Sequence, residues 1–235
     1  MSDLEDRIAS FRERMEAACH RAGRDIGSVR LVAVSKTVDE TVIADAQLFG
    51  LTHFGENRVQ DATRKFAPLD GSTFRLHLIG QLQTNKARAA AKIAHEIESV
   101  DRMGLIDTLE AESRKLADRG ELAAGDRLRV LLQVNVAREE QKSGCSPEDA
   151  AALVDALLAA PTLDLHGLMT IAPLVPTAEG ARPTFVALRE LRDDLQSRFR
   201  DASLETLSMG MTNDFEVAIE EGSTSIRIGR AIFAP

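Results

Sequence analysis

Eight short apolar segments alternate with longer segments of helical spacing along most of the chain, and this alternation constrains the fold most strongly. The apolar segments have the length and composition of buried strands; they span residues 31–35, 52–54, 74–79, 96–100, 128–135, 163–169, 206–208 and 225–228. The helical segments span residues 38–49, 58–66, 84–93, 102–119, 147–159, 181–200 and 214–220. A strand that is repeatedly followed by a helix predicts parallel pairing, and eight such units can close into a barrel.

An additional helix is predicted before the first strand. Apolar residues recur at positions 4, 8, 11 and 15, and Ser2 with Glu5 fits a capping box. No linker rich in proline, glycine or serine divides the chain. We therefore predict one domain over residues 1–235, with the extra helix in residues 1–25 and the barrel in residues 30–230.

A doubly wound open sheet is the competing architecture for alternating strands and helices. Its dinucleotide-binding form carries a Gly-x-Gly-x-x-Gly turn after the first strand. Here Ser35, Lys36 and Thr37 stand at that place. The sequence therefore favours an α/β fold of the single (β/α)8 TIM-barrel type.

The charge balance and the cysteines argue against several classes of function. The formal net charge is −8 without any run of lysine and arginine, which disfavours nucleic-acid and anionic-membrane partners. Cys19 and Cys145 are far apart and outside any Cys-x-x-Cys spacing, so we expect neither a disulfide framework nor a metal site. The first residues are acidic and no segment is apolar for long enough to cross a bilayer. These features predict a cytoplasmic protein.

Several candidate functional residues follow the predicted strands, at the carboxyl ends where parallel barrels carry their active sites. Lys36 follows the first strand, and an amine there can form a Schiff base. The last two strands are followed by Gly210, Thr212 and Gly229, which can hold a phosphate near a helix amino terminus, with Thr212 as the expected N-cap. A solvated lysine and ordinary turn chemistry would explain each of these residues equally well.

Arg227 alternates with Ile226 and Ile228 in the last strand, so its side chain is expected inside the barrel. A buried arginine needs a partner. That partner is either the ring nitrogen of a ligand or an internal acid such as Glu216 or Asp214. The amine, the phosphate donors and this cation together suggest bound pyridoxal 5'-phosphate (PLP).

Other polar residues are expected to have supporting roles. His53, His77, His95 and His166 lie in or beside different elements without the spacing of metal ligands, so we interpret them as structural or supporting groups. Glu56 is expected in a loop, where it could orient Lys36 or bind a water. Lys142 could be a solvated loop charge or a secondary contact for a ligand near the barrel mouth, and we favour the solvated charge.

An ordered series of motifs carries a family resemblance. The motifs are LVAVSK at 31–36, FGENRVQ at 54–60, HLIGQLQ at 77–83 followed by Asn85 and Lys86, QVN at 133–135, KSG at 142–144, GLM at 167–169, LSMGMTN at 207–213 and RIG at 227–229. This series resembles the pyridoxal phosphate homeostasis proteins, which look like the barrel domain of alanine racemase without its second domain. The resemblance covers essentially the whole chain.

The resemblance implies that Lys36 carries PLP as a Schiff base, that Arg227 faces the pyridine nitrogen, and that Thr212 and Gly229 help to hold the phosphate. The family commonly has threonine at the position of Arg230, so the phosphate cup is expected to differ there. The full set of predicted cofactor-binding residues is Lys36, Asn57, Ser208, Gly210, Thr212, Arg227, Gly229 and Arg230.

The predicted chemistry favours a carrier over an enzyme. A permanent cation at the ring nitrogen disfavours protonation of the pyridine and weakens the ring as an electron sink. The alanine racemases use a tyrosine as their second base, and this chain contains none. We therefore expect a monomer that carries or regulates PLP, in vitamin B6 and amino-acid homeostasis, with PLP-dependent apo-enzymes as candidate partners. A PLP-dependent amino-acid racemase, a Schiff-base aldolase and a partner-binding protein are the alternatives.

Overall fold

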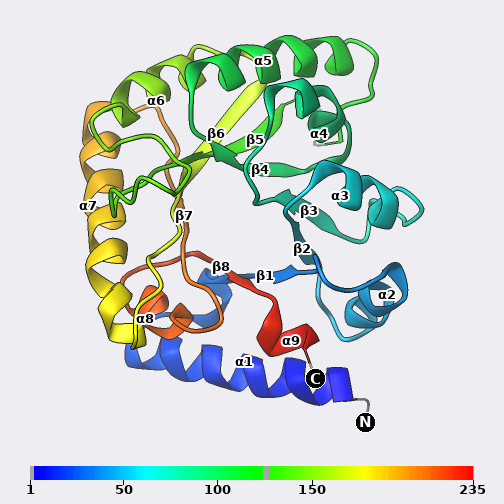
Figure 1. Cartoon of the computed structure of the whole chain (residues 1–235), viewed down its shortest axis with the longest axis vertical. Coiled ribbons are helices and arrows are strands. Elements are labelled where there is room, and N and C mark those ends of the chain that lie inside the picture. The colour runs from blue at the N-terminus through cyan, green and yellow to red at the C-terminus, as the bar shows by residue number, and fades with distance from the viewer. Residues whose placement is uncertain (1–2, 124–126, 235) are drawn as a thin grey trace.

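Eight parallel strands close into a barrel in the computed structural model of this protein, which describes residues 3–123 and 127–234. The strands pair in chain order, and β8 pairs with β1 to complete the ring (Figure 1). Their bounds are β1 Arg30–Val34, β2 His53–Glu56, β3 Arg75–Leu78, β4 Glu96–Val100, β5 Leu128–Gln133, β6 Leu163–Met169, β7 Thr206–Ser208 and β8 Ser225–Ile228. The closed ring confirms the predicted TIM-type barrel and excludes the open sheet.

Helices surround the barrel and cover its outer face (Figure 1). They are α1 Asp3–Arg21, α2 Glu40–Leu48, α3 Val59–Phe66, α4 Ala87–Ile93, α5 Met103–Ala117, α6 Ala150–Leu158, α7 Arg182–Arg198, α8 Phe215–Glu220 and α9 Arg230–Phe233, with single 3-10 turns η1 Ile26–Ser28, η2 Thr84–Lys86 and η3 Ala178–Ala181. Their apolar faces and the outward side chains of the strands form the hydrophobic core. Among the described helices, none combines the length and the hydropathy that a bilayer span requires.

Helix α1 is the additional helix that the sequence predicts before the first strand. Its apolar residues at positions 4, 8, 11 and 15 are buried, and it packs along α8 and α9 (Figure 1). The rings of Phe11 and Phe215 lie 4.6 Å apart between their centroids, which is a favourable aromatic distance. Ser2, the predicted N-cap, lies outside the described residues.

Strand β2 extends two residues beyond its predicted end at residue 54. Gly55 and Glu56 pair with His77 and Leu78 of β3. A Cβ atom at residue 55 would lie 3.0 Å from a methyl group of Val32, so glycine fits this crowded position in the strand. The expectation that Glu56 lies in a loop was therefore wrong.

The turn before α8 also differs from the prediction. The helix begins at Phe215 with Asp214 at the N-cap position, so the expectation that Thr212 caps it was wrong. The carboxylate of Asp214 accepts a hydrogen bond of 2.6 Å from the N–H of Met211. This contact holds residues 211–214 in a turn and delays the start of the helix.

Glycine is required at position 167 in β6. Gly167 has φ +152°, and a Cβ atom there would lie 1.9 Å from the carbonyl oxygen of Thr206 in β7. The register between β5 and β6 shifts at the same level, between Val130 and Leu131. The barrel therefore depends on a residue without a side chain at this irregularity.

Candidate functional site

A pocket with a volume of about 810 Å³ opens at the carboxyl ends of the strands, a size that suits a small organic ligand. Residues at or after the carboxyl ends of β1, β2, β3, β5, β6, β7 and β8 form its wall. Six of the eight predicted cofactor-binding residues line it: Lys36, Asn57, Thr212, Arg227, Gly229 and Arg230. The fold thus brings together groups from both ends of the chain.

Lys36 presents its amine to this pocket. Strand β1 pairs with β8, with Ala33 opposite Ile228, so Lys36 and Gly229 leave neighbouring strands at the same end of the barrel. The Lys36 side chain is exposed, and within the described part of the chain its amine has no hydrogen bond or ion pair. An unpaired amine at a pocket is available for reaction with a carbonyl compound.

A buried ion pair supports the backbone immediately before Lys36. The Nζ atom of Lys65 donates to Glu56 Oε1 at 2.9 Å and to the carbonyl oxygen of Ser35 at 2.7 Å. The Ser35 hydroxyl donates to the same carboxylate oxygen of Glu56 at 2.7 Å. Glu56 therefore points outward to α3 and holds Ser35, the residue before Lys36, and among the described residues it makes no hydrogen bond or ion pair with Lys36 itself.

Two predicted cofactor-binding residues lie behind the pocket wall. Ser208 and Gly210 are buried and do not line the pocket. Gly210 has φ +99°, and a Cβ atom there would lie 2.6 Å from the Cβ of Ala218. Its lack of a side chain lets α8 approach the barrel closely, which is a packing requirement.

Arg227 reaches the pocket from inside the barrel, as the alternation in β8 predicts. Its guanidinium donates to Ser208 Oγ at 2.6 Å and to the carbonyl oxygen of Thr170 at 2.7 Å. Glu98 Oε2 lies 3.9 Å from the guanidinium. Burial lowers the pKa of Arg227, and the charges of Glu98 and Asp214 oppose this shift. An arginine remains charged under these conditions.

The carboxylate that lies within ion-pair distance of Arg227 is Glu98, which the sequence analysis did not name. Glu216 lies on the outside of the barrel, where its carboxylate pairs with Arg14 and Arg21. Asp214 contributes only its charge; burial raises the pKa of its carboxyl, while the Met211 N–H and the charge of Arg227 lower it. Glu98 comes from the opposite side of the barrel interior, on β4.

A cluster of buried ionisable groups continues from Glu98 down the barrel axis. The Nδ1 atom of His77 lies 2.9 Å from Glu98 Oε1 and 3.3 Å from Glu96 Oε1. Burial lowers the pKa of His77, but the charges and hydrogen bonds of the two carboxylates outweigh it and raise the pKa to about 9. Burial raises the pKa of Glu96, and His77 and Arg30 more than reverse that effect.

This cluster has the composition of a metal site, because the ligand atoms of His77, Glu96 and Glu98 all lie within 4.8 Å of one another. The sequence reasoning overlooked it, because the residues come from two strands. A protonated imidazole, Arg30 and Arg227 already supply cations to the two carboxylates. A divalent ion would displace the imidazole proton and would add charge beside two guanidinium groups. The absence of a metal thus stays our prediction.

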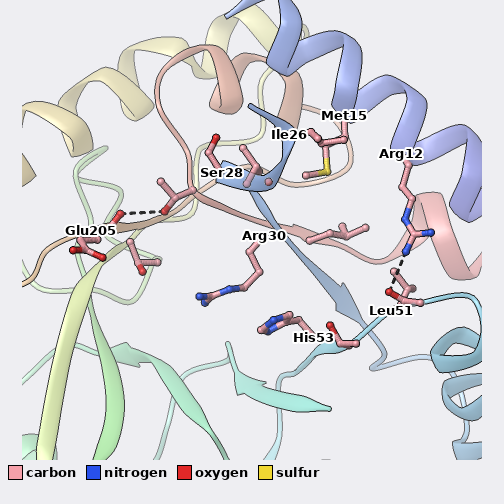
Figure 2. Close-up of a pocket in the computed structure, with 15 residues that line it drawn as sticks. Arg12, Met15, Ile26, Ser28, Arg30, Leu51, His53 and Glu205 are labelled. Carbon is pink, nitrogen blue, oxygen red and sulfur yellow. Dashed lines mark hydrogen bonds between the residues drawn. The ribbon is translucent and has the colours of Figure 1, made fainter. Parts of the chain in front are cut away.

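A second pocket lies at the opposite end of the barrel, near the amino ends of β1, β2, β7 and β8. Figure 2 shows the side chains of Arg30 and His53 at this pocket. The Nδ1 atom of His53 lies 2.9 Å from Nε2 of His77. Burial, with the charges of His77 and Arg30, lowers the pKa of His53 to about 3. His53 is thus neutral and accepts a hydrogen bond from the charged His77.

Lys142 is less exposed than a solvated loop charge would be. Its side chain lines the carboxyl-end pocket, and its Nζ atom donates to the carbonyl oxygen of Ala172 at 2.8 Å and pairs with Glu139. Its amine also donates to the carbonyl oxygen of Ile171 at 3.5 Å and is therefore occupied by three partners, in contrast to that of Lys36. The expectation of a solvated Lys142 was wrong.

The whole chain is similar to proteins of one family. The alanine racemase N-terminal domain family matches residues 7–235. Two relatives, each named pyridoxal phosphate homeostasis protein, come from Aquifex aeolicus and Pseudomonas aeruginosa. The first is 42% identical over 97% of this chain and 96% of its own length, and the second is 43% identical over 99% and 96%. The chain belongs to this family.

A solved structure of similar sequence shows the same barrel. PipY of Synechococcus elongatus PCC7942, whose structure was determined with PLP bound, is 33% identical to this chain. The match has a TM-score of 0.83 and covers 99% of this chain and all of PipY. The family resemblance that the motifs indicated is therefore confirmed.

The sequence analysis did not predict that Glu96, Glu98 and His77 meet inside the barrel. One signal was present, since β4 carries glutamates at alternate positions between apolar residues, and alternate side chains of a barrel strand point inward. Two carboxylates inside a barrel require cations. This argument would have pointed to Arg227 and to a histidine from a neighbouring strand.

Proposed function

We propose that this protein binds PLP in the carboxyl-end pocket, as a Schiff base on Lys36, and carries or regulates this cofactor in vitamin B6 and amino-acid homeostasis. The observation that carries the proposal is the unpaired amine of Lys36 at a pocket that also contains the guanidinium of Arg227. The names of the relatives and the PLP bound to PipY support it.

The residues of the pocket fit the chemical groups of PLP. Arg227 offers a fixed cation to the pyridine nitrogen, and Asn57 offers an amide to the ring. The hydroxyl of Thr212, the backbone at Gly229 and the guanidinium of Arg230 are donors for a phosphate. The bound cofactor supplies an aldehyde and a conjugated ring, while the protein residues bind and orient it.

Absorbance titration with PLP, followed by borohydride reduction and peptide mass mapping, tests the proposal. The wild-type protein is expected to develop a near-visible band and to retain a pyridoxyl adduct on Lys36. Lys36→Ala is expected to lose both signals. Lys142→Ala is the matched control, because Lys142 lines the same pocket with a paired amine. An adduct on Lys142 or Lys86 in place of Lys36 would show that the assignment is wrong.

We further propose that the protein does not turn amino acids over. The permanent charge of Arg227 disfavours a protonated ring nitrogen, and the sequence contains no tyrosine to act as a second base. The PLP-loaded protein should be incubated with L-alanine, L-serine and L-glutamate, while optical purity and keto-acid formation are followed. Sustained turnover that disappears in Lys36→Ala would favour the racemase alternative.

The proposed role implies transfer of PLP to apo-enzymes that require it. We place this transfer in the cytoplasm, since both cysteines are free, as is usual in a reducing compartment. We propose a monomer as the carrying form, in which the pocket mouth stays open to partners. Light scattering over a range of concentrations tests this, and a dimer that persists on dilution would contradict it.

A further inference from the structure

A continuous series of buried contacts connects the two pockets through the barrel axis. It runs from Arg227 at the carboxyl-end pocket to Ser208, Glu98 and His77, and reaches His53 at the amino-end pocket. Four of these side chains are almost completely buried, and His53 is partly exposed. The amino end of the series lies in the region shown in Figure 2.

The direction of the hydrogen bonds near Arg227 is determined by chemistry. A guanidinium can only donate, so Arg227 donates to Ser208 Oγ at 2.6 Å. The Ser208 hydroxyl must then direct its own proton elsewhere, and it donates to Glu98 Oε2 at 2.5 Å. The other oxygen of Glu98 accepts from His77 Nδ1. Glu98 therefore acts on Arg227 through an oriented hydroxyl.

The second glutamate of β4 offers an internal comparison. Glu96 contacts the same imidazole at 3.3 Å, but its other oxygen faces Arg30 at 3.4 Å. Glu96 and Glu98 are both almost completely buried, carry the same charge and lie two residues apart on one strand. Only Glu98 contacts Ser208 and lies near Arg227.

We propose that Glu98 and Ser208 are positioning residues for Arg227. The carboxylate of Glu98, which His77 holds in place, fixes the guanidinium through the Ser208 hydroxyl. The fixed guanidinium in turn sets the pKa of the bound PLP. This inference rests on the proposed function. Without the Ser208 hydroxyl, the guanidinium would keep the Thr170 carbonyl as its one hydrogen-bond partner among the described residues. Without the Glu98 carboxylate, it would lose the negative charge that lies 3.9 Å away, so more of its positive potential would act on the cofactor.

The charged groups around this bridge are few within the described part of the chain. Arg227 faces Glu98 from β4 and Asp214 from the turn before α8, and Asp214 is influenced by Lys142. His77 faces Glu96 and Glu98 from β4 and His53 from β2, and its charge also acts on His95. His166 from β6 acts on Glu96. Arg30 from β1 reaches this group through Glu96. A change at Glu98 therefore alters the field at Arg227 most directly.

Three variants, Glu98→Gln, Ser208→Ala and Glu96→Gln, test the proposal in comparison with the wild-type protein. Each is loaded with PLP, and the near-visible absorption of the bound cofactor is followed as a function of pH. Removal of the Glu98 charge disfavours the protonated form of the cofactor, so the pH midpoint is expected to move down by about one unit. Ser208→Ala is expected to move it in the same direction. Glu96→Gln is expected to shift it by less than half as much.

The controls separate this inference from the proposed function. Circular dichroism establishes that each variant folds; if Glu98→Gln does not fold, Ser208→Ala decides, because it removes a single oxygen atom. Wild-type protein that forms no Lys36-dependent band would overturn the proposed function, and this inference with it. Normal loading of the wild type together with unshifted midpoints in Glu98→Gln and Ser208→Ala would overturn only the inference. An equal shift in Glu96→Gln would also overturn it.

Discussion

Lys65 and Glu56 form an ion pair of 2.9 Å in which both side chains are at most 2% exposed. The pair joins α3 to the carboxyl end of β2, and through the Ser35 carbonyl and hydroxyl it also holds the end of β1. Lys36 is the next residue in the chain. The position of Lys36, the proposed Schiff-base lysine, thus depends on Lys65, a buried lysine that does not line the pocket.

Loss of Lys65 should destabilise the protein strongly. Lys65→Met leaves the Glu56 carboxylate buried without its cation, which costs about 3–5 kcal/mol of unfolding free energy. Urea denaturation measures this change. Lys92→Met is the matched control, because the Lys92–Glu121 pair has a similar length of 3.0 Å but is exposed, and little change is expected there. Equal effects in both variants would contradict the structural assignment.

The free energy of unfolding should decrease as the pH rises above 6.5, because His77 loses its proton. The pKa of this histidine is raised to about 9 in the folded protein, against about 6.5 in the unfolded chain. Its stabilisation is therefore complete below pH 6.5 and is lost as the pH rises through 9, by up to about 3 kcal/mol. Thermal or urea unfolding between pH 6.5 and 9.5 measures this slope.

His77→Gln should flatten the alkaline slope, since glutamine does not titrate. His95→Gln is the control: burial and the charges of Arg75 and His77 lower the pKa of His95 to about 4. A histidine whose pKa is lowered in the folded protein changes the free energy of unfolding only as the pH falls below 6.5. An alkaline slope that persists in His77→Gln would show that another group causes it.

Gly167→Ala should disrupt the contact between β6 and β7. The new Cβ atom would lie 1.9 Å from the Thr206 carbonyl oxygen, and the backbone at residue 167 has φ +152°. We expect a loss of about 3 kcal/mol or more in unfolding free energy. Gly104→Ala in α5 is the control, because beyond its chain neighbours and the nearby backbone of its own helix the added methyl group would meet no atom within 4 Å, and alanine favours a helix. Similar stability of the two variants would contradict the strained geometry.

Phosphate recognition should contribute more to PLP retention than the aldehyde alone. Pyridoxal, which lacks the phosphate, is expected to bind at least about tenfold more weakly, a difference of roughly 1.4 kcal/mol. Thr212→Val should weaken PLP binding without affecting pyridoxal, whereas Thr212→Ser should retain the hydroxyl and the affinity. Spectral titration measures both ligands. Equal affinities for the two in the wild-type protein would refute this role of the pocket.

The predicted elements agree with the structure where local pattern decides them. The bounds of β4, β6, β7 and β8 match the prediction, although β4 and β7 contain more polar than apolar residues. The predicted start of α2 lies two residues before the observed one, because Asp39 caps the helix by accepting from the N–H groups of Thr41 and Val42. Helix α9 was missed because only four residues form it.

The sequence by itself determined the repeating strand and helix units, the inward direction of Arg227 and the placement of Lys36 at a strand end. These properties follow from the two-residue and 3.6-residue periods of neighbouring side chains. Only the tertiary structure decided that Glu98 reaches Ser208, 110 positions away in the chain, and that Glu56 turns outward to Lys65. Barrel closure brings together residues from strands that are distant in the chain, and the local sequence pattern does not predict which buried charged side chains then come into contact.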